Sequence, residues 1–225
     1  DDCFMKILNH KYFDVIEVVE DSPETLIIEE PVLFRNVVDE LSYQVKNDEG
    51  DYVLSDDSSR ILTLSKNLML ITDIYNLDAY SKQLKNKLTS IITTNYSDID
   101  GKELLIEMLN EMGVRIANNL PYSVTYKTNI AFSDVVKFLD FSFDYSTLSL
   151  LESLIEMIST SFEILKYKML VTVNLKDYLA KQELDEIIKY FAYKKIPLLM
   201  LERHQHYEMD DCKHTRIIDK DLCVI

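Results

Sequence analysis

Short apolar segments alternate with amphipathic helical segments at both ends of this chain, and that alternation restricts the folds open to it. Residues 68–71 are apolar on both faces, a pattern typical of a strand buried inside a parallel sheet. Residues 169–173 form a similar apolar segment, and a helical pattern over 180–191 leads to another at 197–201. We therefore predict an α/β fold whose head is a mostly parallel sheet covered by helices.

The alternation stops between residues 79 and 118, where two helical patterns follow each other without a strand between them. Pro121 ends the second helical pattern, and a short strand is expected again at 141–144. A helical insertion within one α/β domain accounts for this order. We predict residues 1–78 as the first part of the head, 79–132 as an inserted α-helical leg, and 133–225 as the second part of the head.

Glycine is scarce, and its positions exclude the common phosphate-binding loops. The chain has only Gly50, Gly101 and Gly113. A P-loop reads G-x-x-x-x-G-K-[ST], so that successive backbone N–H groups surround phosphate. The single Gly-Lys step, at Gly101, would require glycine at position 96, where the chain has Tyr96. The G-x-G-x-x-G of dinucleotide-binding folds is also absent. These spacings argue against P-loop NTP hydrolysis and Rossmann-type redox chemistry.

Composition indicates a globular protein of the cytoplasm. Hydrophobic residues make up 47% of the 225 residues, which is too many for an intrinsically disordered chain. The longest apolar run, 196–201, is far shorter than the roughly 20 residues of a membrane span, and no secretory signal pattern opens the chain. Three cysteines without a C-x-x-C pair are typical of a reducing compartment.

Lysines gather in two groups although the formal net charge is −15. The segment 79–96 contains Lys82, Lys85 and Lys87 and no acidic residue. Solvated helix faces are the plain interpretation of such groups, since lysines cover most protein surfaces. Binding of phosphates is the alternative, and it requires the acidic surface to face elsewhere. The second group consists of Lys166, Lys168, Lys176, Lys181, Lys189, Lys194, Lys195 and Arg203.

The segment from His204 to His214 is the best candidate for conventional catalysis. It contains three of the four histidines, Cys212 and several carboxylates, and it follows a predicted strand. Imidazole, thiolate and carboxylate groups can bind zinc, but no recognised zinc spacing is present. A polar surface loop is the other interpretation. A metal-dependent hydrolase would use His204, His206, Asp210 or Asp211, Cys212 and His214.

Several segments resemble the type II-A CRISPR-associated Csn2 family. They are the strand and helix start over 25–34, the segment Leu68 to Asp78, the helix and strand over 162–174, the helix 181–190 and the strand 197–202. Within the second of these, Leu-Ile-Thr-Asp-Ile at 70–74 is the most specific piece. Order and spacing agree over nearly the whole chain.

The resemblance implies a head distantly like P-loop ATPases, without a P-loop or nucleotide chemistry, and a helical leg. It also implies a non-enzymatic homotetrameric ring that binds ends of double-stranded DNA through a lysine-rich channel. Such proteins act in spacer acquisition, beside the CRISPR integrase complex and the guide-RNA-directed nuclease. A protein adaptor that binds only those partners, and no DNA, remains the alternative. The DNA-binding candidates are Lys82, Lys85 and Lys87, followed by Lys127, Lys137 and Lys168.

The resemblance also implies calcium bound to a carboxylate-rich stretch between the second leg helix and the head. The matching residues here, 118–129, contain no carboxylate. Calcium takes six to eight oxygen ligands, usually including carboxylates. Either calcium binds nearby groups, for which Asp134, Asp140 and Asp144 are the candidates, or this chain dispenses with it.

Overall fold

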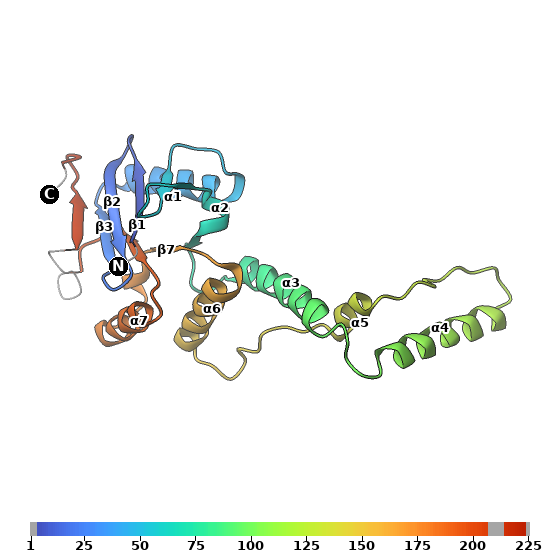
Figure 1. The fold of residues 1–225 in the computed structure, drawn as a ribbon. Helices are drawn as coiled ribbons and strands as arrows, with labels where there is room; N and C mark the ends of the chain where they lie inside the picture. The colour runs from blue at the N-terminus through green and yellow to red at the C-terminus, as the bar shows by residue number, and fades with distance from the viewer. Residues whose placement is uncertain (1–3, 207–213, 224–225) are drawn as a thin grey trace. The chain divides into compact units, whose positions relative to one another are not determined.

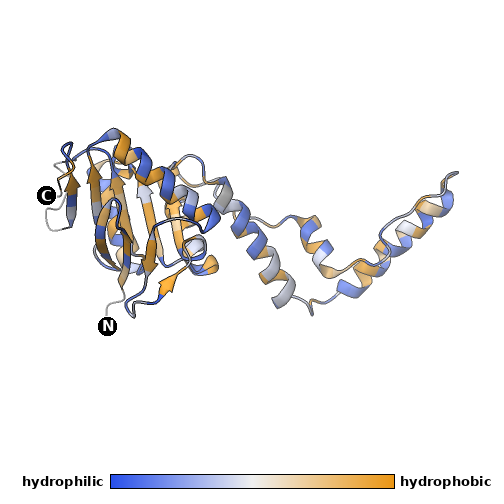
Figure 2. Ribbon diagram, turned by 90° about the horizontal axis from the view of Figure 1, so that it is seen from above, coloured by the Kyte–Doolittle hydropathy of each residue, from blue (hydrophilic) through white to orange (hydrophobic). Residues whose placement is uncertain are grey.

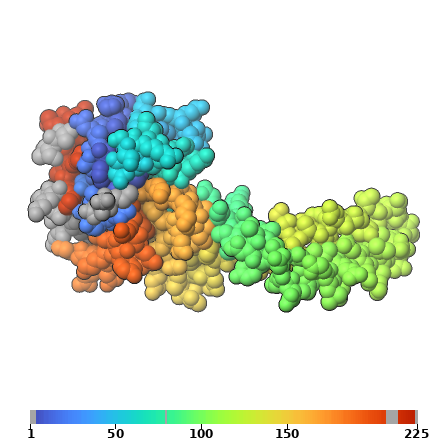
Figure 3. Space-filling model, viewed as in Figure 1, coloured from blue at the N-terminus to red at the C-terminus, as the bar shows by residue number. Residues whose placement is uncertain are grey.

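The computed structural model describes residues 4–206 and 214–223 (Figure 1). The chain divides into two compact units. The first, the head unit, combines Asp1–Leu77 with Ser149–Ile225. The second, the helical unit, is the intervening segment Asp78–Leu148. In the space-filling view, the blue and cyan N-terminal segments and the orange and red C-terminal segments pack together into the head unit (Figure 3).

A five-stranded sheet forms the centre of the head unit, and its paired strands are all parallel. This confirms the predicted α/β fold with a parallel sheet. Because parallel strands need long crossover connections, the chain can leave and re-enter the sheet between two neighbouring strands. The helical unit is inserted in this way between β6 and β7. In spatial order the strands are β6 (Leu68–Ile71), β7 (Met169–Val173), β8 (Leu198–Glu202), β3 (Glu24–Ile28) and β9 (Thr215–Ile218).

A second, antiparallel sheet belongs to the same unit. Its strand β1 (Phe4–Asn9) pairs with β2 (Phe13–Val19) on one side and with β4 (Val53–Ser55) on the other. The short helix α2 (Leu64–Asn67) follows the last strand of this sheet. The strand order is β2 (Phe13–Val19), β1 (Phe4–Asn9), β4 (Val53–Ser55) and β5 (Ile61–Leu62).

Three long helices cover the parallel sheet, together with the short 3₁₀ helix η1 (Leu175–Asp177). The helix α1 (Pro31–Asn47) begins at its proline, and the Glu30 carboxylate caps it by accepting a hydrogen bond from the Leu33 N–H at 2.5 Å. The helix α6 (Leu150–Leu165) begins with a capping box. It lies with α7 (Lys181–Tyr193) on the side of the sheet away from α1 (Figure 1).

The core of the head unit explains the apolar sequence of the strands. Leu26 and Ile28 join a buried cluster that includes Val37 and Leu41 of α1. Ile27 between them is also fully buried, although it points to the opposite face of the sheet. Since α1 and the antiparallel sheet cover one face and α6 and α7 the other, the strands are apolar at successive positions, as their orange colour in Figure 2 shows.

The helical unit contains α3 (Asp78–Asn95), α4 (Lys102–Asn119) and α5 (Phe132–Leu139). Its small core includes Leu84 of α3 and Val136 of α5, which are 0% and 1% exposed. Because α5 packs against α3, the unit continues to Leu148, beyond the leg boundary at 132 that the sequence indicated.

The strand expected at 141–144 does not form. These residues have no regular secondary structure, and the Phe143 ring stacks on Tyr145, with the ring centroids 6.3 Å apart. The alternating aromatic residues of this segment therefore make a local ring contact instead of pairing with a strand. Among the residues that the structure describes, no helix has both the length and the apolar content needed to cross a bilayer.

A buried amide holds α1 against the start of β4. The Gln44 side chain donates a hydrogen bond to the Tyr52 carbonyl and accepts one from the Tyr52 N–H, each at 2.8 Å. Gly50 lies beside it, where a Cβ atom would stand 2.5 Å from Oε1 of Gln44. One of the three glycines is therefore required for close packing in a turn.

We expect Gln44→Ala to lower the free energy of unfolding of the head unit by about 1–3 kcal/mol, because both backbone groups of Tyr52 would lose their partner in a buried position. Urea denaturation measures this change. Lys46→Ala, an exposed change on the same helix, is the control and should cost less than about 0.5 kcal/mol. Equal losses in the two variants would contradict the role given to Gln44.

Candidate nucleic-acid interface

Beyond Asp78 in its first turn, one side of α3 presents polar and basic side chains without a carboxylate. At 100° per residue, the exposed positions between 82 and 94 fall on a single face, which we call the α3 polar face. Its two charged residues, Lys82 and Lys87, are lysines with no ion-pair partner among the described residues. The α3 polar face consists of Lys82, Gln83, Asn86, Lys87, Ser90 and Thr94.

Lys85 borders this face, about 60° from Lys82 around the helix. Its Nζ atom is 2.6 Å from Oδ1 of Asp140, which follows the last residue of α5. The neighbouring Leu84 is fully buried. The sequence grouped Lys85 with Lys82 and Lys87, but the structure gives it a carboxylate partner within the unit.

Lys127 and Lys137 also differ in whether they pair with a carboxylate. Nζ of Lys127 is 2.5 Å from Oδ2 of Asp134, and this oxygen also accepts a hydrogen bond from the Ala131 N–H at 2.9 Å. The lysine, and after it the N–H group, lower the pKa of Asp134 from its ordinary value of 3.8. Lys137 is exposed on α5 and has no ion pair among the described residues.

The three carboxylates considered for calcium have other partners. Asp134 and Asp140 each pair with a lysine. Oδ1 of Asp144 accepts a hydrogen bond from the Ser146 N–H at 2.9 Å, and hydrogen bonds from Ser146 lower the pKa of this carboxyl group. Within residues 4–206 and 214–223, no group of three or more His, Cys, Asp or Glu residues is arranged to hold a metal ion.

The described histidines of the 204–214 segment point to different carboxylates. Nε2 of His206 is 3.2 Å from Oδ1 of Asp177, and Nδ1 of His214 is 2.8 Å from Oε1 of Glu24. His204 is exposed. The structure therefore does not bring these three side chains to one centre. Asp210, Asp211 and Cys212, the other candidates of this segment, lie outside the described residues.

Lys168, the candidate in the head unit, lies beside lysines from a distant part of the chain. It lines a pocket of about 280 Å³ together with Lys194 and Lys195. Two carboxylates, those of Glu20 and Glu163, line the same pocket. The sequence contained all three lysines, but only the fold brings them together.

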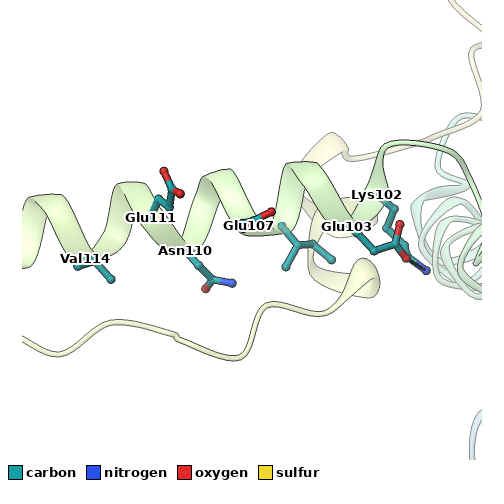
Figure 4. Close-up of a pocket in the computed structure, with 7 residues that line it drawn as sticks. Lys102, Glu103, Glu107, Asn110, Glu111 and Val114 are labelled. Atoms are coloured by element: carbon teal, nitrogen blue, oxygen red, sulfur yellow. Dashed lines mark ion pairs between the residues drawn. The ribbon is translucent and has the colours of Figure 1, made fainter.

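A second pocket, of about 540 Å³, runs along α4 and has an acidic lining (Figure 4). Glu103, Glu107 and Glu111 recur along it at every fourth position. Carboxylates repel phosphate groups, so this surface is a poor candidate for contact with nucleic acid. The remaining lining residues are Lys102, Ile106, Asn110 and Val114.

Another face of α4 is apolar and exposed. Leu104, Met108, Met112 and Ile116 have exposed fractions of 62%, 60%, 53% and 54%, and α4 has no buried residue. We call these four residues the α4 stripe; orange stretches recur along this helix in Figure 2. The four-residue spacing is visible in the sequence, but spacing alone cannot distinguish an exposed stripe from one that faces a core.

Comparison with known proteins identifies a family, and it finds solved structures with low similarity to this chain. The family described as CRISPR-associated protein (Cas_Csn2) matches residues 44–222. Two solved ATP-binding cassettes of ABC transporters are similar at low level. One, in the ADP conformation, has 13% identity and a TM-score of 0.48; the other, nucleotide-free, has 12% and 0.45. Each match covers 96% of this chain and 87% of the other.

The pair of Lys127 and Asp134 yields a direct prediction for the helical unit. A depressed pKa means that the carboxylate stabilises the fold above the ordinary pKa of 3.8, and that this contribution is lost as the pH falls through the depressed value. We expect the pKa of Asp134 to lie below 3.8 in the native chain and to rise in Lys127→Met. Carboxyl NMR titration measures both values. No rise in the variant would mean that the lysine is not the main cause.

Proposed function

Because the chain belongs to the CRISPR-associated Csn2 family, we propose that it binds ends of double-stranded DNA during spacer acquisition. It does so without catalysis and without reading sequence, as a homotetrameric ring in the cytoplasm. Its partners are DNA, further copies of itself, the integrase complex and the guide-RNA-directed nuclease. The observation that carries the proposal is the acid-free α3 polar face on a chain with a net charge of −15.

The α3 polar face suits phosphate groups for electrostatic reasons. Most of the chain repels DNA, so a duplex is directed to surfaces where carboxylates are missing. Lys82 and Lys87 offer unpaired ammonium groups there. Asn86 and Ser90 on the same face are exposed and carry donors of the kind that bind phosphate oxygens. Contacts of this type fix the position of a duplex and carry no sequence information.

The α4 stripe supports self-association of the chain. A continuous exposed apolar surface marks an interaction site more often than an isolated apolar residue does. The stripe is symmetric about position 110: in an antiparallel pair, Leu104 faces Ile116 of the second copy, and Met108 faces Met112 of the second copy. Such self-complementary surfaces are what a two-fold contact requires. A four-membered ring needs this contact and a second one elsewhere.

We expect Lys82→Gln/Lys87→Gln to weaken binding of a linear duplex about tenfold. It should also flatten the slope of log K against log salt by about 0.9 for each lysine that contacts a phosphate. Fluorescence anisotropy over a series of salt concentrations measures both quantities.

Lys85→Gln is the matched control, because the same helix loses a charge that already pairs with Asp140. Its loss of affinity should be less than half of the average loss per lysine in the double variant. If all three lysines contribute equally, or if none does, the α3 polar face is not the contact surface.

Self-association has its own test. We expect Met108→Asp/Met112→Asp to lower the mass measured by size-exclusion chromatography with light scattering, because charges would be buried at the subunit contact. Asn110→Asp/Val114→Asp adds the same two charges on the pocket side of α4 and should leave the mass unchanged. An unchanged mass in the first variant would exclude the α4 stripe as a contact surface.

A further inference from the structure

We infer that the head unit carries a second surface for DNA phosphates, at the edge where β7 and β8 begin. It consists of Lys166, Lys168, Lys194 and Lys195, which we call the edge lysines. The inference rests on the proposed function, and it adds a contact surface on a unit other than the one that contains α3. Nothing in the sequence pattern alone distinguishes these lysines from solvated ones.

The topology of the sheet brings the edge lysines together. β7 and β8 are neighbouring parallel strands, so the connections that lead into them lie at the same edge. Lys166 and Lys168 lie in the connection from α6 to β7, and Lys194 and Lys195 lie in the connection from α7 to β8. A hydrogen bond of 2.9 Å from the Leu170 N–H to the Pro197 carbonyl joins the two strand starts.

The charge at this edge is opposite in sign to that of the chain. Lys168, Lys194 and Lys195 line the same 280 Å³ pocket, and its carboxylates are those of Glu20 and Glu163. Lys195 is 3.8 Å from Glu20, a loose ion pair. Lys168 and Lys194 have no carboxylate within ion-pair distance in the described part of the chain. Within the pocket, three lysines against two carboxylates leave a local positive charge.

The backbone at the edge is strained where two of the lysines lie. Lys166 and Lys195 have φ angles of +64° and +57°, in the left-handed region that glycine or asparagine usually occupies after a helix. Other residues are disfavoured there, because the Cβ atom comes too close to the neighbouring backbone. A favourable interaction with the helix dipole could be made from the last turn, yet neither α6 nor α7 has a basic residue there. Lys166 and Lys194 are instead the C-cap residues of these two helices, and Lys195 follows Lys194.

A row of phosphates fits this arrangement better than one small anion does. Three of the edge lysines face one pocket, while Lys166 does not line it. A single phosphate in the pocket would therefore leave Lys166 unused. The backbone of a duplex presents many phosphates in succession and can engage cations inside and outside the pocket together. The two connections come from different crossovers, so this is a surface and not one loop.

The first test removes charge without touching the strained positions. In the full assembled protein, Lys168→Gln/Lys194→Gln should weaken binding of a linear duplex threefold to tenfold. It should flatten the salt slope by up to about 1.8, since each phosphate contact contributes about 0.9. Lys181→Gln/Lys220→Gln removes two charges from the opposite edge of the same sheet and should change neither quantity. Glu163→Gln should strengthen binding, because it removes a carboxylate from the pocket.

A second test separates binding from folding. We expect Lys166→Gly/Lys195→Gly to raise the melting temperature, because glycine relieves the left-handed strain, and at the same time to weaken DNA binding. If these lysines only stabilised the fold, replacing them would not raise the melting temperature and weaken DNA binding at the same time.

The outcomes distinguish this inference from the proposed function. If the native protein binds duplex DNA and the Lys168/Lys194 variant binds equally well with the same salt slope, the edge lysines are not a DNA contact and the proposed function stands. If the native protein binds no duplex DNA, both fail. Weaker binding in the edge variant, with a normal control, supports the inference whether or not the α3 variants also lose affinity.

Discussion

Burial of one parallel sheet on both faces is the constraint on which the head unit depends. Because β6, β7 and β8 are apolar on both sides, helices must cover each face, and polar side chains are left to the edges where strands begin and end. Many α/β folds bind phosphate with glycine-rich turns where strands end. This chain has three glycines, and Gly50 is needed for packing against Gln44, so side chains take the place of a glycine-rich loop in the proposed phosphate contacts.

Ion pairs divide the lysines of the helical unit into two classes, and the proposed DNA contact uses the lysines without an ion pair. Lys85 and Lys127 pair with Asp140 and Asp134 and help to hold the helical unit together. Lys82 and Lys87 have no such partner. A chain with a net charge of −15 can bind a polyanion only where its carboxylates are absent or already paired. The α3 polar face meets this condition in the helical unit. In the head unit, the edge lysines outnumber the two carboxylates beside them, Glu20 and Glu163.

Features that depend on local sequence could be predicted. Features that depend on contacts between segments far apart in the chain could not. The parallel strands and the start of α1 at Pro31 followed from continuous apolar segments and helix-start chemistry. The aromatic alternation at 141–144 was mistaken for a strand because ring stacking and strand pairing produce the same pattern. Whether a lysine pairs with a carboxylate, or meets another lysine across two crossovers, is decided by tertiary contacts. The sequence therefore indicated candidate lysines and a helix that carries three of them, but not which of these lysines form ion pairs.

The central claim is that a ring of these chains encloses DNA that enters from an end. A comparison of linear with closed-circular DNA tests this claim most directly. Binding would be compared for a linear duplex and a covalently closed circle of the same sequence and length, at one salt concentration. A ring that threads onto ends binds the linear form and leaves the closed circle unbound. Equal binding of the two forms would contradict the account, because an open basic surface does not distinguish them.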